Sequence, residues 1–228
     1  MTRTSEPFIS IIIPVLRDAE QLARLINTLP VVSVERSSEI IVVDGGSDPA
    51  LEELRVRFPN IRWLQSRIGR GPQMNHGAAV SNGQWLCFIH ADTCLPVGWD
   101  HEIARIDGMS DGVVWSFRFV LDAENWQARL LERVVEWRVR WLDLPFGDQG
   151  LFVRRDVFEV MGGFKSWPLM EDVDIVRRLR QRGRRVHSDL PIRVSPRRWR
   201  RDGWFLRSAG NLCLLMLCGW YERSTMME

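Results

Sequence analysis

Residues 39–48, Glu-Ile-Ile-Val-Val-Asp-Gly-Gly-Ser-Asp, join a short apolar run to an acidic turn that contains glycine. Four consecutive Ile and Val residues are typical of a strand that is covered on both faces. Either Ser47 or Asp48 can cap a helix, which we expect at 49–57. A buried strand that leads through a turn into a helix is the repeating unit of a parallel α/β sheet.

The same alternation of strand and helix extends over the first hundred residues. Residues 8–13 are β-branched and almost wholly apolar, which predicts a buried strand that Pro14 stops. Residues 18–29 follow with Leu and Ile at helical spacing. We therefore expect an α/β fold with a mostly parallel central sheet and helices on both faces. Further elements are expected as a strand at 61–64, a helix at 71–80, and a strand at 85–89 that runs into His90-Ala91-Asp92-Thr93.

The second half of the sequence shows a less regular pattern. A helix is expected at 126–142, and because Trp137 and Trp141 lie on its apolar stripe, we assign both to the core. The other expected elements are a strand at 113–121, a loop at 145–150, a strand at 151–153, and a helix at 171–182 that ends before Gly183.

Composition and organisation indicate one globular domain over residues 1–228. The chain is 45% hydrophobic and 26% charged, which is ordinary for a globular protein. No linker, repeat or low-complexity segment interrupts it. We expect two halves, at 8–112 and 113–203, followed by an apolar helix at 204–228.

The charge balance gives no reason to expect a nucleic-acid partner. There are 31 Lys and Arg against 29 Asp and Glu, for a formal charge of +2. The stretch from Arg177 to Arg207 is rich in arginine and would suit anionic lipid or nucleic acid, but no RNA-binding motif accompanies it. Four cysteines without CxxC or regular spacing fit thiols in a reducing compartment. Because the apolar run at 8–15 is too short and interrupted for a signal peptide, we expect a cytoplasmic protein.

The C-terminal segment 204–221 is strongly apolar, yet too short and too interrupted to span a bilayer. Arg207 and Asn211 lie four residues apart and form a narrow polar stripe on an otherwise apolar helix. Packing onto the domain or onto a partner in a homodimer is one use of such a helix. Docking on the inner face of the membrane, as a peripheral protein, is the other.

Three strand ends supply the first functional signal, because ligands bind at the carboxyl ends of parallel strands. The residues expected there are Pro14, Asp44 and Asp92. Neither GxGxxG nor GxxxxGK[ST] is present, which disfavours a nicotinamide oxidoreductase, an ATPase or a kinase. A nucleotide site without a glycine cradle needs another means to neutralise a diphosphate, and a divalent cation on Asp92 would serve.

Together these segments resemble the family 2 glycosyltransferases, which have a GT-A fold. The resemblance spans residues 8–200 and rests on the order of its motifs. They are Phe8–Pro14, Val43-Asp44-Gly45-Gly46-Ser47-Asp48, His90-Ala91-Asp92, Glu171-Asp172 and Arg197-Arg198-Trp199. Within the family the chain is similar to short bacterial members of the arsenosugar type, also described as radical-SAM-associated.

The resemblance implies a donor site for a nucleoside diphosphate sugar in the first half of the chain. Pro14 to Asp18 and Asp44 would hold the uracil and ribose. The position where family members carry an arginine facing the nucleotide is Met74 here, so Arg70 or Gln73 would substitute for it. Asp48 is assigned instead to the helix cap.

The resemblance also implies a metal, Mn²⁺ or Mg²⁺. Asp92 corresponds to the last acid of the DxD motif, which ligates the cation, and His90 stands where the first acid would be. Neutral imidazole is a tolerable ligand for manganese and a poor one for magnesium. Orientation of a phosphate or a water is the alternative role for His90.

For the chemical step, the resemblance implies Asp172 as the general base for the acceptor hydroxyl, with a simple helix cap as the alternative reading. Glu171 and Asp148 would bind the acceptor. Arg198 would stabilise the diphosphate leaving group, and Trp199, placed with the donor-binding residues, would stack on the donor or on the acceptor. Ser195 replaces the glutamine of the family's QxxRW segment, which is prominent in processive synthases, so transfer of a single sugar is expected.

The sequence therefore predicts an inverting glycosyltransferase that moves one sugar, most simply from a UDP-sugar, to a hydroxyl acceptor that is a small molecule or lipid-linked. Two alternatives stay open. A sugar-phosphate nucleotidyltransferase shares this type of fold, although residues 14–20 lack its glycine-rich loop. A non-catalytic nucleotide-sugar sensor or membrane adaptor would explain His90 and Ser195.

Overall fold

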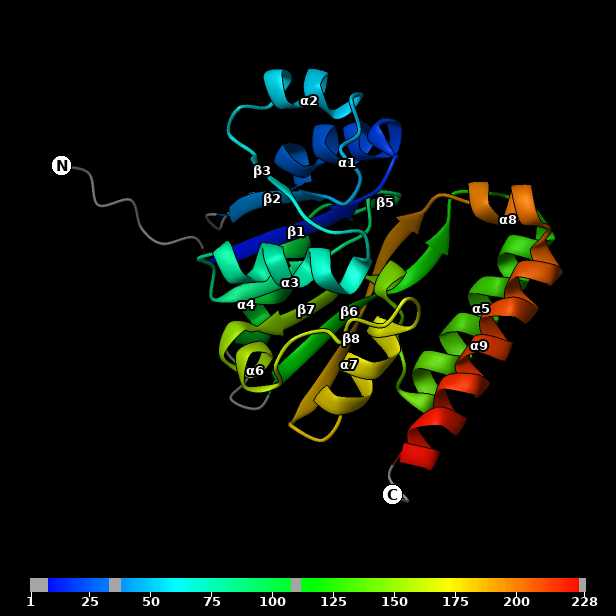
Figure 1. The fold of residues 1–228 in the computed structure, drawn as a ribbon. Coiled ribbons are helices and arrows are strands. Elements are labelled where there is room, and N and C mark those ends of the chain that lie inside the picture. Colours follow the sequence, from blue (N-terminus) through cyan, green and yellow to red (C-terminus); the bar gives the residue numbers. More distant parts are fainter. Residues whose placement is uncertain (1–7, 33–37, 108–111, 226–228) are drawn as a thin grey trace.

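A computed structural model describes residues 8–32, 38–107 and 112–225. This part of the chain forms a single continuous eight-stranded sheet with helices packed on both faces (Figure 1). The strands are β1 (Ile9–Val15), β2 (Ser38–Asp44), β3 (Arg62–Gln65), β4 (Trp85–Phe88), β5 (Thr93–Cys94), β6 (Gly112–Leu121), β7 (Leu151–Arg154) and β8 (Arg184–Val194). The helices are α1 (Ala19–Val32), α2 (Leu51–Arg57), α3 (Arg70–Val80), α4 (Trp99–Asp107), α5 (Trp126–Leu142), α6 (Arg155–Val160), α7 (Glu171–Leu179), α8 (Arg197–Asp202) and α9 (Trp204–Thr225), with a 3₁₀ turn η1 at Gly147–Gln149.

The sheet order β3-β2-β1-β4-β7-β6-β8-β5 confirms the expected α/β class. The strands β3, β2, β1 and β4 are parallel, and β6 is parallel to β8, while β7 runs antiparallel between β4 and β6. The antiparallel strand β7 joins the two parallel parts into one sheet, and β5 at the edge runs antiparallel to β8. The division of the domain into halves at residues 112 and 113 remains a prediction.

Of three apolar cores in the described part of the chain, the smallest packs α5 and α8 against β6 and β8, and the two larger ones lie on opposite faces of the sheet. One packs α1, α2 and α4 on the sheet through side chains such as Leu25, Leu54 and Trp99. The other packs α3, α6 and α7 through side chains such as Met74 and Val173. Because strands β1, β2 and β4 are covered on both faces, their sequences are continuous apolar runs rather than alternating ones.

The prediction that Pro14 stops the first strand is wrong, because β1 continues through Pro14 to Val15. The carbonyl of Ile12 points toward β4, because it accepts a hydrogen bond from the backbone N–H of Ile89 at the end of β4. The backbone N–H and C=O groups of residues two apart on a strand point to the same neighbouring strand. The backbone nitrogen of Pro14 therefore points toward β4, beyond Ile12 and Phe88, the last residues that pair between β1 and β4. Because no β4 residue pairs with Pro14, its missing N–H removes no hydrogen bond from the sheet. On the other side, Pro14 pairs with Val43 of β2.

Three other expectations need correction. The core assignment of Trp137 and Trp141 is wrong, since these side chains are 58% and 69% exposed; the buried side of α5 is formed by Ala128, Val135 and Val139. Helix α7 ends at Leu179, so Gly183 does not terminate it. No element was expected at 184–194, where the chain forms β8.

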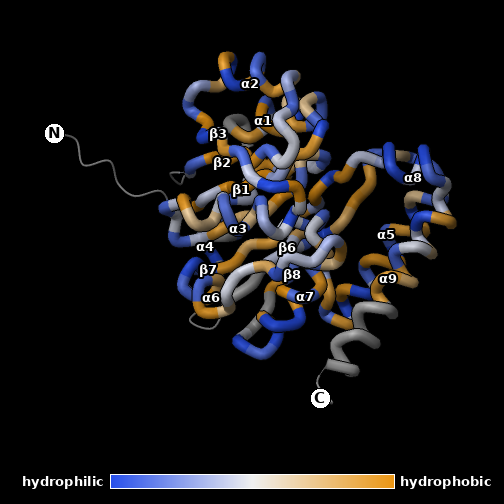
Figure 2. The backbone as a smooth tube through the Cα atoms, in the orientation of Figure 1, coloured by the Kyte–Doolittle hydropathy of each residue, from blue (hydrophilic) through white to orange (hydrophobic). Residues whose placement is uncertain are grey.

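The C-terminal segment forms a helix, α9, whose side chains are described as far as Leu215. Leu214 and Leu215 are partly buried and pack against the core that holds α3, α6 and α7 on the sheet. No helix in the described part of the chain is long and apolar enough to cross a membrane. Hydrophobic positions alternate with hydrophilic ones along α5 and along α9 as far as Leu215 (Figure 2).

Candidate active site

A cavity of about 470 Å³ lies at the carboxyl ends of β1 and β4. The β1 loop, the start of α3, η1, the loop before α7, α8 and α9 all contribute to its walls. The cavity brings together many of the residues that the sequence predicted for donor, acceptor and catalysis: Pro14, Asp18, Arg70, Gln73, His90, Asp148, Asp172, Arg198 and Trp199.

Asp172 reaches the cavity from the first turn of α7. Met170, in the left-handed conformation with φ of 63°, turns the chain into this helix. The Asp172 carboxylate accepts hydrogen bonds from the backbone N–H of Gly147 at 2.7 Å and of Val173 at 2.9 Å. A Cβ at Gly147 would lie 2.9 Å from His90 Nε2 and 3.2 Å from Asp172 Oδ2, so the glycine lets both side chains approach the same point. Asp172 is thus oriented, and each of its oxygens keeps a lone pair for another donor.

Asp148 lies on the 3₁₀ turn η1, near Asp172. The pKa of Asp148 is raised to about 6, chiefly by burial; Arg138 and Arg198 oppose the rise, and Asp172 and Asp92 contribute to it. Its Oδ1 is buried without a hydrogen-bond partner among the described residues. A carboxyl group in this state can serve as either proton donor or acceptor near neutral pH.

Replacing Asp148 with asparagine is expected to stabilise the protein above about pH 6. The folded pKa of about 6 lies above the ordinary value of 3.8, so the wild type loses stability as the pH rises through 6. About two pKa units correspond to roughly 3 kcal/mol at most. Denaturant unfolding across the pH range should therefore show a gain for Asp148→Asn that shrinks below pH 6.

The control for this experiment is Asp122→Asn, which removes a carboxylate that is 72% exposed. An Asp148→Asn variant that is no more stable than the wild type at alkaline pH would contradict the burial of a charged Asp148.

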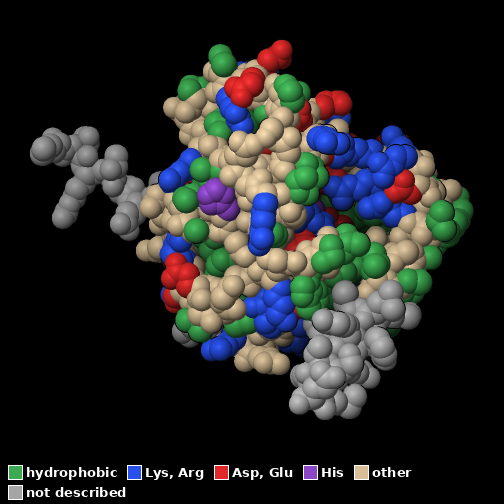
Figure 3. Space-filling view, in the orientation of Figure 1, with side chains coloured by type: hydrophobic (Ala, Val, Ile, Leu, Met, Phe, Trp, Pro, Cys, Tyr) green, Lys and Arg blue, Asp and Glu red, His purple; other side chains and the backbone are tan. Residues whose placement is uncertain are grey.

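Arginines surround the cavity and pair with the acids behind its wall. Arg70 Nε lies 2.8 Å from Glu171, whose side chain is 1% exposed, and Arg198 lies 3.0 Å from Asp92. Arg70 and Arg198 line the cavity, whereas Glu171 and Asp92 do not. Each of these acids compensates the positive charge of its arginine from behind the wall. Arginine side chains gather over α8, beside a hollow in the surface (Figure 3).

Helix α8 is tied to the β1 loop by a bidentate ion pair between Arg197 and Asp18. Arg197 also lies 3.8 Å from Asp92. Trp199 is 6% exposed and packs edge-on to Phe119, with Arg207 over its ring. Since Trp199 still borders the cavity, it can present only part of its ring to a ligand.

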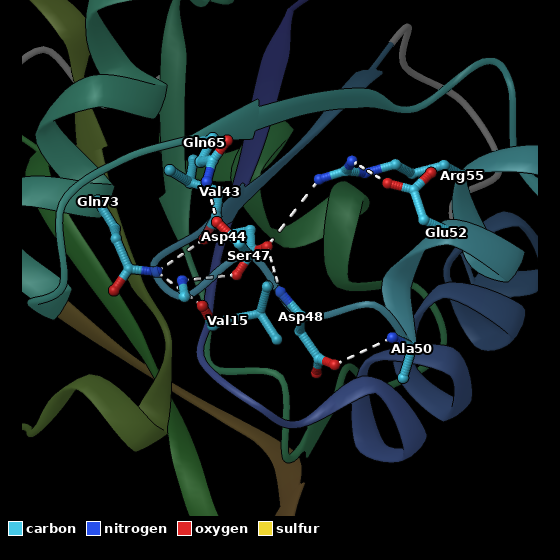
Figure 4. A network of polar contacts seen from close by, with 11 residues as sticks. Val15, Val43, Asp44, Ser47, Asp48, Ala50, Glu52, Arg55, Gln65 and Gln73 are labelled. Carbon is cyan, nitrogen blue, oxygen red and sulfur yellow. Dashed lines mark hydrogen bonds and ion pairs between the residues drawn. The ribbon is translucent and has the colours of Figure 1, made fainter.

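Asp44 is not brought into the cavity. Its carboxylate is 1% exposed and accepts hydrogen bonds from the backbone N–H of Gly46 and Asp48, at 2.9 and 3.1 Å (Figure 4). Asp48 accepts from the N–H of Ala50 and so holds the turn before α2. A role of Asp44 in donor binding stays a prediction.

Gln73 lines the cavity, but its amide nitrogen is already engaged. Its Nε2 donates to the carbonyls of Val15 and Val43 at 2.8 and 2.7 Å, which clamps the ends of β1 and β2 together (Figure 4). Gly45 allows this approach, since a Cβ there would meet the Gln73 amide at 2.9 Å.

Two groups at the end of β4 could hold a divalent cation: His90, which lines the cavity, and Asp92, which lies behind Arg198. Asp92 offers a carboxylate, and burial together with Arg70 and Arg198 holds the pKa of His90 well below its usual range, so the imidazole is neutral. The described residues contain no group of three or more His, Cys, Asp or Glu that could hold a metal by themselves. Mg²⁺ is usually bound by one or two carboxylates plus phosphates; Asp92 is the carboxylate at the end of β4, and Arg198 would share it with the cation.

Some cavity residues were not singled out for the site in the sequence. Phe146 and Leu169 line it, and Arg138 lies 3.4 Å over the ring of Phe146 and donates to Gln149. Arg207 and Asn211 also line it, so the polar stripe of α9 faces the cavity. That stripe was a signal in the sequence, but its direction depends on how α9 packs.

The chain is similar to known glycosyltransferases in sequence. The family described as Glycosyl transferase family 2 matches residues 10–166. Glycosyltransferase AglE of Haloferax volcanii is 32% identical over 172 residues, which are 70% of this chain and 57% of AglE. The chain thus spans little more than half the length of this relative.

Solved structures of two glycosyltransferases share the fold. Mannosyltransferase PcManGT from Pyrobaculum calidifontis, in complex with GDP-Man and Mn²⁺, has a TM-score of 0.62 at 16% identity, covering 83% of this chain and 57% of that protein. S. aureus TarS has a TM-score of 0.65 at 14% identity, covering 82% of this chain and 36% of TarS. At such identities the likeness shows the fold alone.

Proposed function

This chain belongs to the family 2 glycosyltransferases and has their GT-A fold, and from this premise we propose that it transfers one sugar from a nucleoside diphosphate sugar to a hydroxyl acceptor. The observation that carries the proposal is the cavity in which the oriented carboxylate of Asp172 faces the same space as Arg70 and Arg198. One side of such a site can take a proton while the other receives the negative charge of a diphosphate. The narrower likeness to arsenosugar-type members remains a prediction.

The donor would bind between the β1 loop and the start of α3. Pro14 and Asp18 border the side where a base and ribose would lie, and UDP is the nucleotide we propose. Arg70 and Arg198 would face the diphosphate, because a guanidinium presents a rigid fork that matches phosphate oxygens. Each arginine is held in place by a buried acid behind it, Glu171 or Asp92.

The chemical step we propose is a single displacement. The acceptor oxygen attacks the anomeric carbon while the bond from that carbon to the diphosphate oxygen breaks. The proton of the acceptor hydroxyl passes to Asp172, and the electron pair of the broken bond leaves with the diphosphate, next to Arg198. Attack opposite the leaving group inverts the anomeric configuration. Asp148 would hold another acceptor hydroxyl.

Asp92 and His90 would hold a divalent cation, Mn²⁺ or Mg²⁺, on the diphosphate. When bound, the cation would add positive charge at the leaving group. The neutral state of His90 supports this assignment, since a protonated imidazole has no lone pair to donate.

Thermal unfolding with nucleotides and nucleotide sugars, each with and without Mn²⁺, tests the proposal. A specific donor should stabilise the protein by about 2.7 kcal/mol when its free concentration exceeds Kd about a hundredfold. UDP and UDP-sugars should act in this way, more strongly with Mn²⁺, and other nucleoside diphosphates should not.

Turnover assays then separate the alternatives. Release of UDP from a UDP-sugar with an added hydroxyl acceptor supports transfer. Binding of UDP without turnover of any UDP-sugar would identify a sensor, and product from a sugar phosphate with a nucleoside triphosphate would identify a nucleotidyltransferase.

A further inference from the structure

Helix α5 carries an apolar stripe that faces away from the core. Its members are Trp126, Leu130, Val134, Trp137 and Trp141, spaced at four, four, three and four residues. Each of these side chains is between 44% and 69% exposed. At helical spacing they lie on one side of the helix, within an arc of about 80°.

The fold itself does not need this stripe. The opposite side of α5 is already apolar and buried, through Ala128, Val135 and Val139 against β6 and α8. One buried stripe is sufficient to hold a surface helix on its domain. A second, exposed stripe with three tryptophans marks an interaction surface rather than packing.

Helix α9 extends the same surface. Phe205, Leu206 and Leu212 are between 52% and 76% exposed, and the ring of Phe205 lies 6.0 Å from that of Trp126. These residues lie on the side of α9 opposite Arg207 and Asn211, which face the cavity. Helices α5 and α9 lie on the same side of the molecule (Figures 1 and 2). We call the α5 stripe together with Phe205, Leu206 and Leu212 the α5–α9 apolar face.

Arginines border this face on α5. An α-helix turns about 100° per residue, so Arg133 and Arg140 lie on the side of α5 directly next to the apolar stripe, and Arg129 lies next to these two. Arg133 and Arg140 are exposed and have no ion pair among the described residues, whereas Arg129 pairs with Glu132. Glu136 is the one exposed acid on this helix within the described chain, so the border is positive.

We propose that the α5–α9 apolar face docks onto the surface of an anionic lipid bilayer. Exposed tryptophans beside arginines are the composition of helices that lie at the headgroup level. The tryptophan rings enter between the headgroups, and the arginine guanidinium groups bind lipid phosphates. The proposal does not depend on sugar transfer.

Charge favours lipid over a second copy of the chain. A two-fold dimer interface brings the same patch of both subunits together, so the arginine border of one subunit faces the apolar face and arginines of the other. An anionic bilayer presents charge opposite to that of Arg133 and Arg140, the two border arginines that have no ion pair within the described chain.

Vesicle flotation of the full chain tests the proposal. The wild type is expected to float with vesicles of phosphatidylcholine and phosphatidylglycerol, to bind phosphatidylcholine vesicles more weakly, and to lose binding as salt is added. Trp137→Ser with Trp141→Ser should lower the partition coefficient at least about tenfold. Arg133→Gln with Arg140→Gln should lower it roughly thirtyfold on the anionic vesicles alone.

The matched control is Val56→Ser with Val160→Ser, which removes two apolar side chains that are 82% and 68% exposed on α2 and α6. This variant should float as the wild type does, and thermal melts of every variant should match the wild type because the altered side chains are exposed.

Two results would overturn the proposal. In the first, the wild type stays in the soluble fraction with anionic vesicles, or the tryptophan and arginine variants float unchanged. In the second, sedimentation velocity shows a dimer that Trp137→Ser with Trp141→Ser converts to monomer, which would assign the α5–α9 apolar face to a second copy of the chain.

Discussion

Replacing Asp172 with asparagine is expected to lower kcat about 10²–10⁴-fold, the usual contribution of a general base. The side chain lies at the start of α7, where the N–H groups of Gly147 and Val173 orient its carboxylate toward the cavity. Asparagine has nearly the same shape and cannot take the proton of the acceptor hydroxyl. The affinity for the nucleoside diphosphate should change little, because the donor would be held by Arg70, Arg198 and the β1 loop.

Steady-state kinetics together with calorimetric binding of UDP would measure both effects, with Asp122→Asn as the control. Asp148→Asn belongs in the same series, since Asp148 lies close by and has a raised pKa of about 6. If Asp148→Asn loses most of its kcat while Asp172→Asn keeps the wild-type turnover, then Asp148 is the general base and Asp172 is not. A thermal melt of each variant separates loss of the base from loss of the fold.

Replacing Arg198 with glutamine is expected to lower kcat about 10²–10³-fold, as removal of one donor to a developing negative charge does in other enzymes. Arg198 lines the cavity, and Asp92 lies 3.0 Å behind its guanidinium. Because charge on the diphosphate grows as the bond to the sugar breaks, the loss should be larger in kcat than in donor affinity.

Arg200→Gln is the matched control, because Arg200 lies on the same helix, α8, and is exposed. It should leave both kinetic constants near the wild-type values. If Arg198→Gln raises only KM and leaves kcat unchanged, Arg198 binds the ground state alone and does not stabilise the leaving group.

Much of the fold could be predicted from local patterns. The helix at 126–142 and the strands around residues 9–13, 39–43 and 85–88 were found because the spacing of apolar side chains and the turn residues act over only a few positions. Strand β8 could not be found in this way. Its sequence, Arg-Arg-Val-His-Ser-Asp-Leu-Pro-Ile-Arg-Val, is interrupted by charged residues and a proline, and its pairing with β6 is irregular.

The sequence predicted which residues belong to the candidate site better than it predicted how they are arranged. Pro14, His90 and Asp172 lie on one cavity, the first two because parallel strands end at the same edge of the sheet. The engagement of Asp44 by its own turn, and of Gln73 by the carbonyls of Val15 and Val43, depends on where backbone N–H and C=O groups come to lie. A side chain with a chemically suitable group can therefore be used up by the fold.

The run at 39–48, with its neighbours 8–13 and 85–89, determined by itself that this protein has an α/β sheet with a ligand site at one edge. Tertiary structure alone decided which side of each helix is covered. The tryptophans of α5 point outward because another side of that helix meets the core, and Arg207 and Asn211 point inward because α9 packs over the cavity. It also joined Arg197 to Asp18, which are 179 positions apart. Helical and strand periodicity show which residues share a face, but which face meets a neighbour depends on packing between segments far apart in the sequence.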